Sequence, residues 1–106
     1  MSINWKSLRK RIPSNVQVGT KKYYNIVYVD SFEDPEVLGV SQPSINQIVI
    51  KNSLSDRQTV LTYLHEYIHS LSDANDLKIT ESQVIALEKL LPIILKSDNI
   101  FITRKK

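Results

Sequence analysis

Hydrophobic positions repeat at strand-like spacing in the first half of the chain and at helical spacing in the second half. Residues 16–18 alternate, and residues 23–29 are almost entirely β-branched or aromatic, so the two segments together predict a hairpin. Residues 38–41 and 47–51 predict two further short strands, and Pro43 either restricts the first of them to a sheet edge or ends it. The first half therefore predicts a sheet of three to four strands.

Two helices are predicted in the second half, and similar capping sequences mark their starts. Residues 55–58 (Ser-Asp-Arg-Gln) and 80–83 (Thr-Glu-Ser-Gln) each place a hydroxyl residue at the N-cap and a glutamine at the third helical position. The first helix is expected to end at residue 71 or 72, and the polar residues 72–79 are expected to reverse the chain. Its apolar stripe has helical spacing and consists of Val60, Leu64, Ile68 and Leu71.

The second helix carries Val84, Leu87 and Leu91 on one side. Pro92 is expected to kink or end it, because proline lacks an N–H and its ring clashes with the preceding turn. Residues 93–95 are apolar and are expected to continue as a packed last segment.

These elements predict a single α+β domain over residues 1–106. A small antiparallel or mixed sheet is expected to pack on the first helix and on a second, antiparallel C-terminal helix. Residues 1–11 are expected to form a basic N-terminal arm or a short helix, and residues 98–106 a basic C-terminal tail.

Composition and charge exclude several classes of protein. The chain has no cysteine, which excludes a disulfide framework and any cysteine-ligated zinc finger. No stretch approaches the roughly 18 consecutive apolar residues that a membrane span needs, and no apolar run follows the N-terminal basic residues as in a secretory signal. We therefore expect a cytoplasmic protein without membrane contact. The basic clusters at both ends are interpreted as solvated surface, and a nucleic-acid partner is not expected, because no aromatic residues alternate with them.

The strongest chemical signal is His65-Glu-Tyr-Ile-His69, an H-E-x-x-H motif inside the first predicted helix. His65 and His69 are the only histidines of the chain, and four-residue spacing stacks their rings on one helix face, where both can reach a single Zn²⁺. Glu66 lies about 100° round the helix from His65, beside the ligands. It is therefore placed to accept a proton from a zinc-activated water molecule.

A third zinc ligand is needed, because catalytic zinc commonly has three protein ligands and one open position. Ser72 and Asn75 stand where the extended H-E-x-x-H-x-x-G-x-x-H motif has its glycine and third histidine, so the ligand must be a carboxylate. The acids that follow the motif are Asp73, Asp76, Glu81 and Glu88.

Antiparallel packing of the two helices ranks these acids. With a turn centred near residue 76, residues 81–83 lie beside residue 69, so Glu81 is the predicted ligand and Asp76 the runner-up. Glu88 is expected about 10 Å further along, opposite the start of the first helix. Glu81 also has a purely structural explanation, since acids are favoured at helix N-termini.

The motif, the short loop after it and residues 79–91 (ITESQVIALEKLL) resemble very small zincin-type proteins of phages and mobile elements, which are related to the ImmA/IrrE-type metallopeptidases. The resemblance covers the second half of the chain, and the hairpin and strand before the motif fit a minimal zincin fold. It implies zinc on His65, His69 and Glu81, with Glu66 as the base. The twelve-residue interval between His69 and Glu81 is shorter than in larger glutamate-ligand zincins.

The sequence therefore predicts a small zinc metallopeptidase acting on a peptide or protein, and the resemblance implies that an element-encoded protein could be its substrate. Tyr63 and Tyr67 are expected to pack rather than to take part in the reaction. One alternative is a zinc-stabilised binding module with little or no catalysis that contacts a protein or nucleic acid. Another is a DNA-associated protein that uses the basic ends.

Overall fold

A computed structural model describes residues 3–96 of the chain. Its elements are α1 (Trp5–Lys10), β1 (Asn15–Gly19), β2 (Lys22–Val29), β3 (Gly39–Gln42), the 3-10 turn η1 (Pro43–Ile45), β4 (Gln47–Lys51), α2 (Asp56–Asn75) and α3 (Glu81–Lys96). The α+β class is confirmed, and the basic N-terminal segment contains a short helix. The predicted C-terminal tail, residues 98–106, lies outside the described residues.

The four strands form one mixed sheet in the order β1-β2-β4-β3. β1 and β2 form the predicted antiparallel hairpin, and β3 pairs antiparallel with β4. β2 and β4 run parallel, so the chain crosses from one to the other through β3. β3 is consequently an edge strand, and Pro43 begins the turn that ends it, as the sequence predicted.

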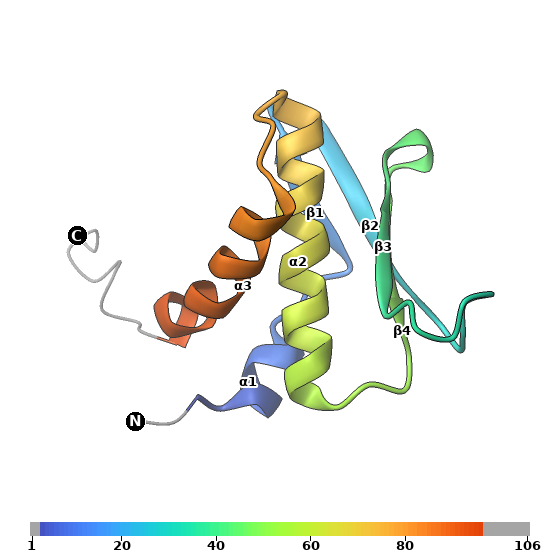
Figure 1. Cartoon of the computed structure of the whole chain (residues 1–106), viewed down its shortest axis with the longest axis vertical. Helices are drawn as coiled ribbons and strands as arrows, with labels where there is room; N and C mark the ends of the chain where they lie inside the picture. The colour runs from blue at the N-terminus through green and yellow to red at the C-terminus, as the bar shows by residue number, and fades with distance from the viewer. Residues whose placement is uncertain (1–2, 97–106) are drawn as a thin grey trace.

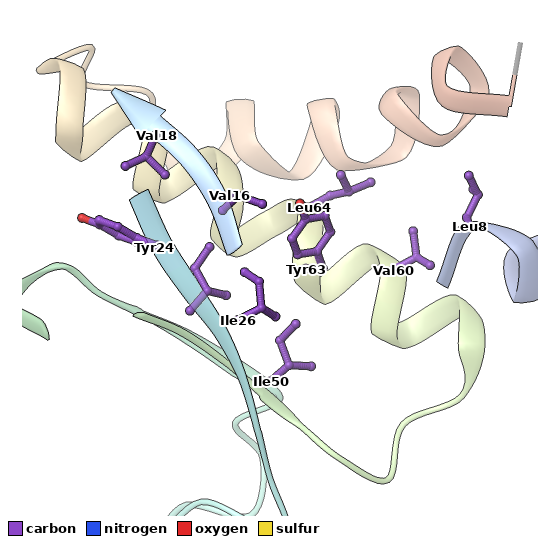
Figure 2. Close-up of a cluster of buried hydrophobic side chains, with 10 residues drawn as sticks. Leu8, Val16, Val18, Tyr24, Ile26, Ile50, Val60, Tyr63 and Leu64 are labelled. Carbon is purple, nitrogen blue, oxygen red and sulfur yellow. The ribbon is translucent and has the colours of Figure 1, made fainter. Parts of the chain in front are cut away.

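Helix α2 lies between the sheet and α3, while α1 packs near its start (Figure 1). The core fills the space between the sheet and α2, where side chains from both point toward one another (Figure 2). The sheet contributes Val18, Tyr24 and Ile26, and Val60 and Leu64 come from the predicted stripe of α2. Helix α2 therefore contacts the sheet on one side and α3 on another.

Helix α2 extends to Asn75, about one turn beyond the predicted end. Asp76 ends it in the left-handed conformation (φ 54°), and its N–H donates to the carbonyl of Ser72. The side-chain amide of Asn75 donates to the carbonyls of Val18 and Leu71, at 2.8 Å in each case. The predicted helix was too short because Asp73 and Asn75 are polar, and the contact of Asn75 with β1 is long-range.

Helix α3 begins at the predicted capping box: Thr80 N–H donates to Gln83 Oε1, and Gln83 N–H donates to Thr80 Oγ1. It continues through Pro92 to Lys96, so the proline does not end the helix. Ile93, Ile94 and Leu95 are 51%, 44% and 37% exposed, so the prediction of a packed last segment over residues 93–95 was wrong. Among residues 3–96, no helix combines the length and apolar character needed to cross a membrane.

Candidate metal centre

His65 and His69 lie one turn apart on the side of α2 that faces α3. Their ring centroids are 4.9 Å apart, and the ring planes are inclined at 58°. The side chains are 21% and 31% exposed, so both rings are half-buried and open to solvent. The predicted stacking on one helix face is present.

Glu81, in the first turn of α3, places its carboxylate against both histidines. Oε1 lies 2.8 Å from His69 Nε2, and Oε2 lies 3.2 Å from His65 Nε2. One donor atom from each of the three residues lies within 4.8 Å of the others. The side chain of Glu81 is 61% exposed, so the group opens toward solvent. The structure thus brings together the three residues predicted to hold the metal.

The donor atoms fit zinc in kind and in spacing. Two imidazole nitrogens and a carboxylate form a set that zinc uses in proteins, and donors at about 2.0–2.1 Å from a tetrahedral ion lie about 3.3 Å from one another. The separations of 2.8 Å (Oε1 to His69) and 3.2 Å (Oε2 to His65) are close to that value, and one donor atom from each residue lies within 4.8 Å of the others. The three residues therefore offer the kind of donor set that zinc takes from three protein ligands.

Glu88 contacts the other nitrogen of His65: its Oε1 lies 2.5 Å from Nδ1. The sequence analysis placed Glu88 opposite the start of the first helix, whereas the structure places it two turns along α3 against the middle of α2. That placement was wrong because an antiparallel turn centred at residue 76 pairs residue 88, twelve residues after it, with residue 64, twelve before it, and not with the helix start at Asp56. The sequence did contain a signal for Glu88, because it follows Glu81 by seven residues and the two acids therefore share one helix face.

Glu66 points toward β3 from the neighbouring side of α2. Burial is the largest cause of its raised pKa, and the nearby Glu81 carboxylate raises it further. His65, His69 and a hydrogen bond from the backbone N–H of Ser41 act in the opposite direction. A carboxyl with a raised pKa lies closer to the range in which a general base works at neutral pH.

The edge strand β3 approaches α2 very closely at Gly39. A Cβ atom at this position would lie 2.5 Å from Cγ2 of Thr62 and 3.1 Å from the carbonyl oxygen of Val49. A glycine is therefore required for the observed separation of strand and helix. Next to this contact is a pocket of about 210 Å³, lined by Leu38, Gly39, Leu61, Thr62, His65, Glu66 and Glu88.

Two other acids and two tyrosines on or next to α2 lie outside the candidate metal group. Asp73 and Asp76, at the end of α2, are not part of the His65–His69–Glu81 group. Tyr63 is buried and stacks on Tyr67, whose hydroxyl donates to the carbonyl of Gln17 at 2.8 Å. The packing role expected for both tyrosines fits these contacts.

Comparisons with protein-family models, with curated proteins and with solved structures give no match for this chain.

Proposed function

We propose that the chain is a small zinc-dependent peptidase with a minimal zincin arrangement, in which His65, His69 and Glu81 hold the metal and Glu66 is the general base. The proposal rests chiefly on the convergence of both Nε2 atoms on one carboxylate, with Glu66 one residue after the first histidine. Neither a helical histidine pair alone nor an acid at a helix start alone supports a metal. The two features together support one, because the histidine pair and the acid come from separate helices and meet at one point.

The residues divide the chemistry between them. A bound zinc ion supplies Lewis-acid chemistry, which polarises a peptide carbonyl and makes water a stronger acid. Glu66 accepts the proton of the attacking water molecule at its carboxylate and delivers it to the leaving amine nitrogen. The Ser41 N–H orients that carboxylate from the strand side. The base is thus fixed by β3, while the metal ligands come from α2 and α3.

The edge of β3 supports an extended peptide as the substrate. Lys51 N–H donates to the Leu38 carbonyl, and alternation along an antiparallel pair then turns the N–H and C=O of Gly39 away from β4. Backbone groups at such an edge bind an additional strand. The pocket of about 210 Å³ beside Glu66 can accept one side chain of that strand.

A second candidate function, a zinc-stabilised binding module, is favoured by the outer face of α3. Leu90 and Ile93 are 54% and 51% exposed on a helix that is apolar on both sides. Exposed apolar faces of this kind mark contact surfaces in many proteins. In this case zinc would join the two helices, and Glu66 would not be needed.

Metal analysis and hydrolysis assays test the proposal together. The purified chain should contain one zinc per molecule and should cleave an unstructured protein such as casein. Glu66→Gln should retain the zinc and lose cleavage by at least about 100-fold, the lower range for removal of a general base. Glu36→Gln, an exposed loop carboxylate, is the matched control and should cleave normally. Equal cleavage by the Glu66 and Glu36 variants would overturn the role of Glu66, and a zinc-loaded wild type without cleavage would favour the binding module.

A further inference from the structure

The imidazole of His65 lies between two carboxylates. Nδ1 faces Glu88 at 2.5 Å, and Nε2 faces Glu81 at 3.2 Å. A neutral imidazole carries one N–H and one lone pair. The carboxylate beside the N–H accepts a hydrogen bond from it. The carboxylate beside the second nitrogen faces a lone pair, unless a cation lies between that nitrogen and the carboxylate.

The shorter contact favours Nδ1 as the nitrogen that carries the hydrogen. A charge-assisted hydrogen bond from Nδ1–H to Glu88 accounts for the close approach and leaves the Nε2 lone pair directed at the group formed with His69 and Glu81. The nitrogen that ligates a metal is set by the hydrogen bond of the other nitrogen. Nε2 of His65 is then the metal-binding atom.

The burial of Glu88 agrees with such a role. Its side chain is 16% exposed, against 61% for Glu81 two turns earlier on the same helix. A carboxylate shielded from water is costly unless it is paired, and His65 is the partner seen here. Val84 lies between the two acids in the sequence of α3 and is fully buried, so this face of the helix packs against the rest of the protein.

We propose that Glu88 is the positioning residue of the metal centre: it holds His65 as the Nδ1–H tautomer and thereby orients Nε2 toward the zinc. This inference rests on the proposed zinc site, but not on peptidase activity. It gives α3 two functions, since one acid of the helix binds the metal and the other orients a ligand from α2. Such outer partners typically contribute 10–100-fold to metal affinity.

Zinc affinity and the tautomer of His65 test the proposal directly. In competition with a chelator of known affinity, Glu88→Ala should bind zinc about 10–100-fold more weakly than wild type. Glu88→Gln, whose amide oxygen still accepts a hydrogen bond, should lose less. In ¹⁵N–¹H spectra of the zinc-free protein, His65 should carry its hydrogen on Nδ1, and Glu88→Ala should shift it toward Nε2.

Val84→Ala is the matched control, because it loosens the packing of α3 and leaves Glu81, Glu88 and both histidines unsubstituted. It should lower stability while leaving the His65 tautomer unchanged. The proposal is overturned if Glu88→Ala and Glu88→Gln bind zinc as tightly as wild type, or if the tautomer is the same in all variants. If the wild type binds zinc but cleaves nothing, the peptidase proposal fails while the role of Glu88 stands on the affinity data. If the wild type binds no zinc, both fail.

Discussion

His69 Nε2 lies 2.8 Å from Oε1 of Glu81, although the two residues belong to different helices. The contact joins the end of the H-E-x-x-H motif to the first turn of α3. Glu81 is therefore the carboxylate that we propose as the third zinc ligand.

Replacing the third ligand should release the metal. Glu81→Ala leaves two histidines as protein ligands, so we expect the zinc content of the purified protein to fall from one per molecule to a small fraction. Asp76→Asn changes the runner-up acid at the end of α2 and should leave the zinc content unchanged. Atomic emission analysis of both proteins after dialysis checks this. Zinc loss in the Asp76 variant alone would reverse the assignment.

Zinc should stabilise the folded chain, because its ligands are brought together only by folding. At a free zinc concentration 100 times the dissociation constant, the free energy of unfolding should rise by about 2.7 kcal/mol. Thermal unfolding with zinc and with a chelator measures the difference. His69→Ala should remove it, and a zinc-dependent shift of equal size in that variant would place the metal elsewhere.

Glu66 should make the zinc-free protein less stable as pH rises. Its pKa is raised in the folded state, mainly by burial, so between its ordinary and its raised pKa the folded chain binds more protons than the unfolded chain. The free energy of unfolding therefore falls across that window, and the loss persists at higher pH. Glu66→Gln abolishes this dependence and should be more stable than wild type at pH 7, but not at pH 3. Urea unfolding in chelator at both pH values provides the measurement, and equal stability at pH 7 would contradict the prediction.

A side chain at residue 39 should force β3 away from α2. Gly39→Ala places a Cβ 2.5 Å from Thr62 Cγ2, and overpacking of this kind costs about 1–3 kcal/mol. Thr62→Ser removes the colliding methyl group and should restore part of the loss when it is combined with Gly39→Ala. A double-mutant cycle by chemical denaturation gives the coupling. If the changes in the free energy of unfolding caused by the two substitutions are strictly additive, the side chains at residues 39 and 62 do not clash.

The sequence alone predicted those features of the structure that depend on residues close together in the chain. The capping box at Thr80 and the edge position of β3 were both predicted, because each depends on a few residues close together in the chain. The four-residue spacing of His65 and His69 likewise predicted their common face. Glu81 was identified by assuming antiparallel helices joined by a short loop, and its contact with both histidines fits that assumption.

The remaining features depend on contacts between distant segments. The parallel pairing of β2 with β4 follows from how the elements meet, which no local pattern specifies. The last turn of α2 depends on a hydrogen bond from Asn75 to Val18, 57 residues away. The need for glycine at residue 39 became visible only with Thr62 in place.

Because β3 contributes no donor to the His65–His69–Glu81 group, metal retention and turnover make different demands on residue 39. A library randomised at this position and selected only for zinc retention should accept many amino acids. The same library selected for substrate cleavage should return almost exclusively glycine, since a displaced strand no longer supports Glu66 through the Ser41 N–H. Sequencing of the two selected pools would separate the evolutionary constraint of holding a metal from that of using it.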